Sequence, residues 1–206
     1  MKLDILPIGL YQENIYILHE NGHVLIIDPG REGKFITPAI SDQETVDAVI
    51  LTHGHEDHTM GTDDLCERYG CPAYIHPDDL PLIDPAAGRY GYAAPVYTKC
   101  LPLEGHVQAG IFDLTVYHTP GHTAGSVCVR YRNRLFSGDT LFAGDIGRTD
   151  LYSGDEDQMM ESLKFLTTLP RDLIVYPGHG PSSTIGREIE YNHYMYMLRQ
   201  QQNSSI

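Results

Sequence analysis

The chain has 206 residues, 41% of them hydrophobic, and its 28 acidic against 14 basic side chains give a formal net charge of −14. Such a surface excludes a nucleic-acid backbone as the expected partner, because phosphate binding requires clustered Lys and Arg. No apolar stretch approaches the ~20 residues of a membrane span. Residues 1–18 do not resemble a signal peptide. We therefore expect a cytoplasmic protein with no membrane partner, built as one domain over residues 1–206.

The four cysteines indicate neither a metal cluster nor a disulfide framework. Cys66, Cys71, Cys100 and Cys128 include no close metal-binding pair, and reduced thiols are expected in the absence of a secretion signal. Cys128 lies in an apolar run that is typical of a buried strand, so a structural role is expected for it.

The first half of the chain begins with short extended segments. Asn21-Gly22 is a hairpin signal between two of them and predicts an antiparallel start to the sheet. A helix is predicted over residues 61–69, ending at Gly70, with a helical turn near 78–83. The predicted strands cover residues 3–6, 14–19, 24–27, 48–52 and 73–76.

The second half opens with an irregular stretch, residues 85–103, which contains Tyr90, Tyr92 and Tyr97. Loops of this length are often lids or binding surfaces, although these tyrosines could equally pack locally. Strands are then predicted at residues 112–118, 126–131, 135–137 and 174–176. Helices are predicted at 156–168, where the apolar residues recur at helical spacing, and at 187–201. Strands followed by a helix in each half suggest a duplicated sandwich.

The densest group of metal-binding side chains lies at residues 53–58, directly after the apolar run 49–51. His53, His55, Asp57 and His58 fall within six residues, and neutral imidazole and carboxylate are the groups that hold zinc and similar ions. His53 and His55 would point the same way on an extended strand end. Asp57 and His58 could be directed elsewhere by a loop or helix start, toward a second ion. The alternative is a polar surface loop.

Three further segments repeat one design, in which a strand runs into a glycine-containing turn that presents His or Asp. They are residues 117–122, 136–139 and 175–180. Strand ends hold side chains more firmly than free loops do. Each turn alone is a weak signal, but all four segments together supply seven candidate ligands: His53, His55, Asp57, His58, His122, Asp139 and His179.

With these residues in place, the chain resembles the metallo-β-lactamase superfamily over nearly its whole length. The resemblance implies an α/β fold, an αββα sandwich of two mixed β-sheets flanked by helices. It also implies that His53, His55 and His122 hold one metal ion, and that Asp57, His58 and His179 hold a second. Asp139 would bridge the two ions. The implied cofactor is a pair of divalent ions, with zinc expected first and iron or manganese as alternatives.

Two ions ~3.5–4 Å apart share a water, lower its pKa toward neutrality and so supply a hydroxide nucleophile. Asp57 is the candidate catalytic residue, placed to orient this nucleophile and to carry a proton to the leaving group. Other histidines lie outside the matching motifs and are expected to be surface or core residues: His19, His23, His76, His106 and His193. His118 could support a metal ligand from behind, but packing on its strand is the expectation.

Residues 137–150, with 177–181 and 184–188, are most similar to the type II glyoxalase group, whose small bacterial members share these runs. That similarity implies a thioesterase that hydrolyses S-acyl glutathione, with a small-molecule thioester as its partner. Arg148 is the candidate substrate contact, although a structural salt bridge with Asp150 or Asp155 is at least as strong an expectation. The chain lacks the C-terminal helical region that helps the longer enzymes to hold glutathione, so the physiological thioester stays open.

Other functions on the same scaffold are alternatives. A mononuclear iron persulfide dioxygenase would use only His53, His122 and Asp139. A lactonase would need an oxyanion-stabilising tyrosine, which Tyr90, Tyr92 or Tyr97 could provide. An interaction module without activity is disfavoured, because no ligand of the motif is missing. The sequence does not indicate an oligomeric state.

Overall fold

The computed structural model describes residues 1–8, 12–86 and 93–204. The first half of the chain forms one six-stranded sheet, in the spatial order of the sequence. β1, β2 and β3 pair antiparallel, whereas β3, β4, β5 and β6 run parallel. The strands are β1 (Lys2–Ile8), β2 (Glu13–Glu20), β3 (His23–Ile27), β4 (Thr45–Ile50), β5 (Ala73–Ile75) and β6 (Leu101–Pro102).

The second half forms another six-stranded sheet, ordered β12-β11-β10-β9-β8-β7. Its pairs are antiparallel except for β10 and β11, which run parallel. The strands are β7 (His106–Ala109), β8 (Phe112–His118), β9 (Val127–Tyr131), β10 (Arg134–Gly138), β11 (Ile174–Pro177) and β12 (Ser183–Thr184). Both sheets are therefore mixed, and each half of the chain builds one of them.

Alternating side chains on the strands divide the core into layers. Ile15 and Ile17 of β2 face the helices that cover the first sheet, while Tyr16 and Leu18 face the second sheet. This alternation follows from the period of two along a strand. Phe112 and Phe136 of the second sheet complete the layer between the sheets. A third apolar layer lies beneath the C-terminal helices.

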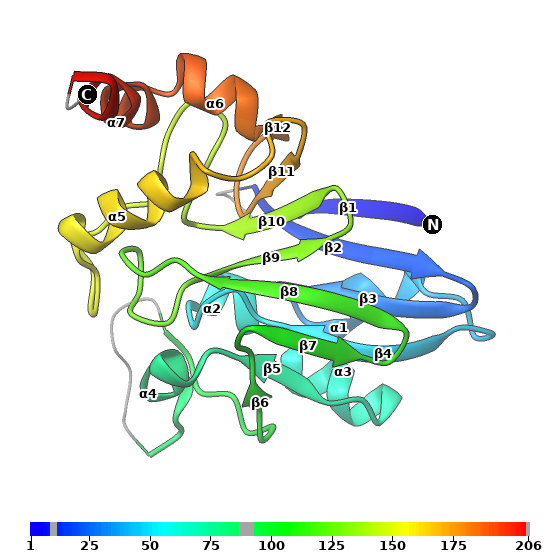
Figure 1. The fold of residues 1–206 in the computed structure, drawn as a ribbon. Coiled ribbons are helices and arrows are strands. Elements are labelled where there is room, and N and C mark those ends of the chain that lie inside the picture. The colour runs from blue at the N-terminus through cyan, green and yellow to red at the C-terminus, as the bar shows by residue number, and fades with distance from the viewer. Residues whose placement is uncertain (9–11, 87–92, 205–206) are drawn as a thin grey trace.

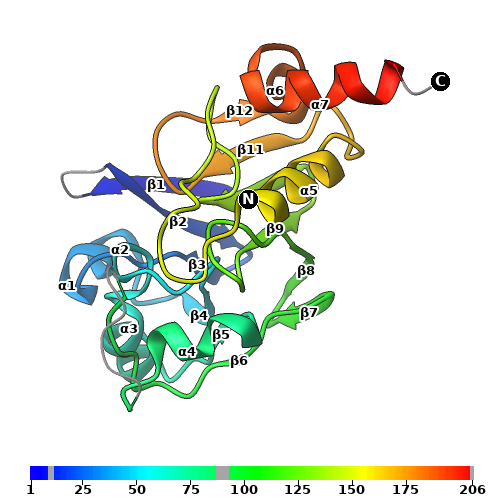
Figure 2. The ribbon, with the colours of Figure 1, turned by 90° about the vertical axis from the view of Figure 1, so that its left-hand side faces the viewer.

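Helices cover the outer face of each sheet. Figures 1 and 2 show α3 (Thr62–Tyr69) and α4 (Leu80–Ile83) on one side of the molecule and α5 (Glu156–Leu166) on the opposite side, with α6 (Ile185–Tyr191) and α7 (His193–Ser204). The remaining short helices are α1 (Gly33–Ile36), η1 (Thr37–Ala39), α2 (Glu56–Thr59) and η2 (Pro77–Asp79). The expected αββα sandwich of two mixed sheets is confirmed. None of the helices in the described ranges combines the length and hydrophobicity needed to cross a membrane.

Most predicted elements appear within a few residues of their expected bounds, but the closing helix does not. Residues 187–201 were expected to form one helix, whereas α6 ends at Tyr191 and α7 begins at His193. Asn192 separates them with an extended backbone, φ −74° and ψ 122°. Its buried side chain donates to the Asp145 carbonyl at 3.0 Å and accepts from the Tyr194 N–H at 3.1 Å. These bonds compete with continuation of the helix.

Local signals were informative where backbone conformation is constrained. Asn21 and Gly22 both have positive φ, 53° and 81°, as the predicted hairpin turn requires. Cys128 is fully buried, as expected.

β7 was not predicted, because residues 106–109 alternate buried and exposed positions with only small apolar side chains. Of the tyrosines in the predicted loop, Tyr90 and Tyr92 lie outside the described residues, and the Tyr97 side chain is 76% exposed.

Parallel pairing brings the candidate residues together. β3 and β4 end at one edge of the first sheet, and β10 and β11 end at one edge of the second. Ligand sites commonly form at the carboxyl ends of parallel strands. The segments that follow β4, β8, β10 and β11 meet there and carry all seven predicted ligands.

Candidate metal centre

His53, His55 and His122 form a first cluster of ring nitrogens. The first two lie in the segment between β4 and α2, and His122 lies in the loop after β8. The Nε2 atom of His122 is 2.9 Å from Nδ1 of His55. All three side chains are buried, and one ligand atom from each lies within 4.8 Å of the others. The first cluster is thus the predicted set.

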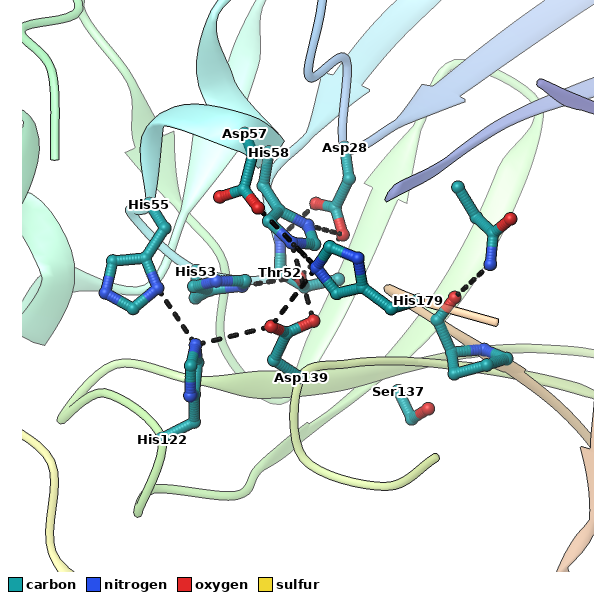
Figure 3. A network of polar contacts seen from close by, with 12 residues as sticks. Asp28, Thr52, His53, His55, Asp57, His58, His122, Ser137, Asp139 and His179 are labelled. Carbon is teal, nitrogen blue, oxygen red and sulfur yellow. Dashed lines mark hydrogen bonds and ion pairs between the residues drawn. The ribbon is translucent and has the colours of Figure 1, made fainter. Parts of the chain in front are cut away.

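Asp57, His58 and His179 form a second cluster (Figure 3). α2 begins at Glu56, so Asp57 and His58 lie in its first turn, and the His58 ring packs against the His53 ring of the first cluster with centroids 4.1 Å apart. The Nε2 atoms of His58 and His179 are 3.4 Å apart, and Nε2 of His179 is 3.5 Å from Asp57 Oδ2.

Asp139 follows β10 directly and lies between the two clusters. Its Oδ2 is 3.5 Å from Nε2 of both His122 and His179, and its Oδ1 is 3.4 Å from Nε2 of His58. The carboxylate therefore faces the first cluster with one oxygen and the second cluster with both (Figure 3). This is the position that a bridging ligand would occupy.

The donor set fits a dinuclear metal centre. Within the described part of the chain, His53 Nε2 and Asp139 Oδ1 are buried and have no hydrogen-bond partner. Buried polar atoms are rarely left in this state unless an ion or a ligand completes them. Imidazole and carboxylate together suit zinc, iron and manganese, so the donor set leaves the choice among these metals open.

Outer partners orient three of the histidines. Nδ1 of His122 lies 2.8 Å from the Arg148 carbonyl, and Nδ1 of His58 lies 3.1 Å from Asp28 Oδ2. Nδ1 of His53 contacts the Thr52 hydroxyl at 3.2 Å. Partners of this kind fix the tautomer of a metal-binding histidine and direct its other nitrogen to the ion. The Nε2 atoms of these rings are thereby directed into the site.

Burial and neighbouring charges also determine the protonation states of the candidate ligands. Burial lowers the pKa of His53 well below its ordinary value, and burial with the nearby His122 lowers that of His55 to about 4. Both rings are therefore neutral near pH 7. Burial opposes charge on His58, but Asp139 and Asp28 raise its pKa. Burial opposes ionisation of Asp57, yet its hydrogen bond with His179 and the other imidazoles bring its pKa well below the usual range.

Asp28, which no sequence pattern indicated, organises the segment around the first histidine. Its Oδ1 and Oδ2 accept the Thr52 N–H and hydroxyl, each at 2.7 Å, and Oδ2 also faces His58. In the sequence, Asp28-Pro29-Gly30 is typical of a turn after a strand. The position of Asp28 directly after the predicted strand 24–27 is a signal that could have identified it. Glu13, also missed, is buried near the second cluster, and burial raises its pKa to about 10.

A pocket of about 370 Å³ opens over the two clusters. Phe142 and Leu151 supply an apolar wall, and Arg148 also lines the pocket. The Arg148 guanidinium pairs with Asp150 through two contacts, Nε to Oδ1 at 2.7 Å and Nη2 to Oδ2 at 2.8 Å. The salt bridge predicted as the alternative role of Arg148 is thus present, with Asp150 as the partner. The other hypothesis, that Arg148 contacts the substrate, stays a prediction.

The histidines set aside in the sequence contact other groups. His23 pairs with Asp47, and His106 with Asp113. His118 stacks on His76 with ring centroids 4.0 Å apart and also contacts the Ala124 carbonyl at 2.8 Å. These two rings and Asp78 make a further group of potential ligands outside the seven. The ring nitrogens nearest Asp78 already have hydrogen-bond partners in the fold.

Comparison with known proteins agrees with this geometry. The family model "Metallo-beta-lactamase superfamily" matches residues 8–179. The chain is 34% identical over 206 residues to "Probable metallo-hydrolase YqgX" of Bacillus subtilis, covering 95% of this chain and 98% of that protein. It is 31% identical over 202 residues to the hydroxyacylglutathione hydrolase of Tolumonas auensis, covering 96% of this chain and 70% of that enzyme.

Solved structures show the same fold. The BLEG-1 B3 metallo-beta-lactamase superposes with a TM-score of 0.85 at 34% identity, covering 94% of this chain and 99% of that one. TTHA1623 in a di-iron-bound form superposes with a TM-score of 0.79 at 36% identity, covering 93% and 99%. Family model, relatives and fold agree, and the chain therefore belongs to the metallo-beta-lactamase superfamily as one of its metallo-hydrolases.

Proposed function

We propose that the seven residues bind two divalent ions and that the protein hydrolyses a small thioester of the S-acyl glutathione class. The observation that carries the proposal is the position of Asp139 between the clusters, with contacts of 3.4 to 3.5 Å to histidines of both. The resemblance to type II glyoxalases and the 31% identity to a hydroxyacylglutathione hydrolase support the substrate class. When bound, the ions supply an activated water and polarise the scissile carbonyl.

In this proposal the first cluster and Asp139 hold their positions throughout turnover, because their side chains are buried. The Arg148 carbonyl keeps the Nδ1 proton of His122 in place, so Nε2 stays available. Asp57 is the proposed proton carrier. Its side chain is 42% exposed and lines the pocket, so it can reach both the substrate and solvent.

The side chains that line the pocket support the proposed class of substrate. Phe142 and Leu151 offer apolar contact to an acyl or thiol group, while Arg148 offers a cation beside them. Since Asp150 neutralises much of the Arg148 charge, we infer a contact that depends on hydrogen-bond direction more than on net charge. We therefore propose that the thiol part of the substrate is a small molecule.

The test measures thiol release from S-lactoylglutathione by metal-replete protein, before and after chelation, alongside an acyl coenzyme A, a lactone and a β-lactam. The expected result is chelator-sensitive thiol release with Asp57→Asn strongly impaired. Metal analysis of the same samples should find two ions per chain. Absence of hydrolysis of every thioester by fully loaded protein would refute the substrate class. One iron per chain with persulfide-dependent oxygen uptake would instead establish the dioxygenase alternative.

A further inference from the structure

Asp79 is a fully buried carboxylate that lies outside the seven candidate ligands. It ends the short helix η2, between β5 and α4. Three neutral donors converge on it: Oδ2 accepts the Gly54 N–H at 2.8 Å and the Thr123 hydroxyl at 2.7 Å, and Oδ1 accepts the Gly125 N–H at 2.7 Å. Burying a carboxylate is costly unless such bonds satisfy its oxygens.

The donors belong to the two segments that carry the first cluster. Gly54 lies between His53 and His55, and Thr123 directly follows His122. The Gly54 segment comes after β4 of the first sheet, whereas the Thr123 segment comes after β8 of the second. One carboxylate therefore ties together two segments from different sheets at the point where their histidines must converge.

The contacts of Asp79 are confined to one side of the site. The hydrogen bonds that it accepts come from residues next to the first cluster, whereas His58 contacts Asp28 and Asp139, and His179 contacts Asp57, His58 and Asp139. Loss of Asp79 should consequently loosen the first cluster and spare the second.

We propose that Asp79 is a positioning residue that holds His53, His55 and His122 in register and thereby sets the metal affinity of the first cluster alone. The inference rests on the dinuclear centre proposed above and not on the identity of the substrate. Groups that orient metal ligands typically change affinity by about 10- to 100-fold when they are removed. An effect of that size, restricted to one of two ions, is the signature of positioning.

The test titrates the metal-free full-length protein with Zn²⁺ against a chromophoric chelator and extracts two stepwise dissociation constants. Asp79→Asn keeps the shape of the side chain but turns an amide N–H toward one of the donors. We expect it to weaken one constant by about 10- to 100-fold and to leave the other unchanged. The matched control is Glu188→Gln, which alters another buried carboxylate that accepts hydrogen bonds, from the Gly144 N–H and the Asn192 amide.

Double variants assign the weakened constant to a cluster. In a His179→Ala background, which impairs the second cluster, Asp79→Asn should keep its full effect. In a His55→Ala background the effect should disappear. Equal weakening of both constants, or a loss no greater than that of Glu188→Gln, would overturn the proposal.

A second pair of variants tests the proposal if Asp79→Asn fails to fold. Thr123→Val removes one donor without changing side-chain volume, and Thr123→Ser keeps the hydroxyl. Thr123→Val should weaken the same single dissociation constant, and Thr123→Ser should keep it at the wild-type value. Equal constants in the two variants would refute the role of the hydrogen bond from Thr123 to Asp79. Failure of the wild-type chain to bind two ions would refute the dinuclear centre itself, which is a different outcome from an inert Asp79.

Discussion

Asp139 is the residue with the most consequences for the site. It is largely buried, and its two oxygens face histidines of both clusters at 3.4 to 3.5 Å. A carboxylate in that position offsets the repulsion between two nearby cations, whereas an amide of the same shape does not.

Asp139→Asn should therefore lower the metal content to below two ions per chain. The second cluster should lose its ion first, because it has two imidazoles where the first has three. Metal analysis after dialysis measures the effect, and the exposed Asp113→Asn serves as control. Two retained ions in Asp139→Asn would show that this carboxylate does not bridge.

His122→Ala should abolish hydrolysis and remove the ion of the first cluster, since His122 Nε2 is only 2.9 Å from the neighbouring ring of His55. His23→Ala is the matched control, because His23 pairs with Asp47 away from the site. Its activity should equal that of the wild type. Full activity in metal-depleted His122→Ala would contradict the ligand assignment.

At the scale of elements, α5 and the loop that carries His122 are held in contact at Gly121. This glycine has φ +139°, and a Cβ there would lie 2.4 Å from the Met159 Cα of α5. The residue before the ligand thus needs both a glycine conformation and a glycine volume.

Gly121→Ala should destabilise the fold by about 2–4 kcal/mol and reduce metal content, because α5 and the loop must separate. Gly70→Ala is the control: Gly70 has φ +64° but open space around it, so it should cost only about 1–2 kcal/mol and leave the metals in place. Urea unfolding and metal analysis report both effects. Equal behaviour of the two variants would show that the α5 contact does not matter.

At the far end of the sandwich, Glu20 of β2 links the two sheets. It accepts a hydrogen bond from the Tyr131 hydroxyl at 2.7 Å and pairs with Arg132. The bond from Tyr131, with that from Arg132, holds the pKa of Glu20 below its ordinary value of 4.5. A carboxylate with a depressed pKa stabilises the fold above its unfolded pKa, and that contribution is lost as pH falls through the folded value.

Glu20→Gln should consequently lower the free energy of unfolding at pH 7 by about 1 kcal/mol. The difference from wild type should shrink as pH falls below about 4.5, where the unfolded carboxyl is protonated. Chemical denaturation at pH 7 and at pH 3.5 measures it. Glu190→Gln, in an exposed pair with Arg171, should change little at either pH. A difference for Glu20→Gln that persisted at low pH would rule out this linkage.

At the scale of the whole molecule, metal binding should contribute to stability, because ligands from both sheets converge only in the folded chain. An ion present at about 100 times its dissociation constant stabilises the fold by about 2.7 kcal/mol. For a chain of this length, chelation should lower Tm by roughly 5–10 °C. Differential scanning calorimetry with and without chelator measures the shift, and restored metal should reverse it. An unchanged Tm would mean that the clusters bind no ion tightly.

Much of the fold followed from local patterns. Short extended segments in the sequence predicted strands such as residues 14–19 and 112–118, and the glycine signals at Gly22 and Gly70 predicted a turn and a helix end. The break at Asn192 could not be predicted, because its cause is a hydrogen bond to the Asp145 carbonyl, which only the tertiary structure brings near.

For the site, the sequence by itself determined the chemistry. Seven histidine and aspartate residues at characteristic spacings identified a metal-binding family, and the structure gathers all seven at the edges of the two sheets. Spacing alone carries this information because ligand type and strand-end position are local properties.

Only the tertiary structure decided how these residues are divided and held. The place of Asp139 between two clusters, the pairing of Arg148 with Asp150, and the roles of Asp28 and Asp79 all depend on contacts between distant segments. Asp28 and Asp79 have no distinctive sequence pattern, since any buried aspartate that accepts backbone N–H groups looks like a turn residue in the sequence. Their function arises where the two sheets meet, which no local pattern encodes.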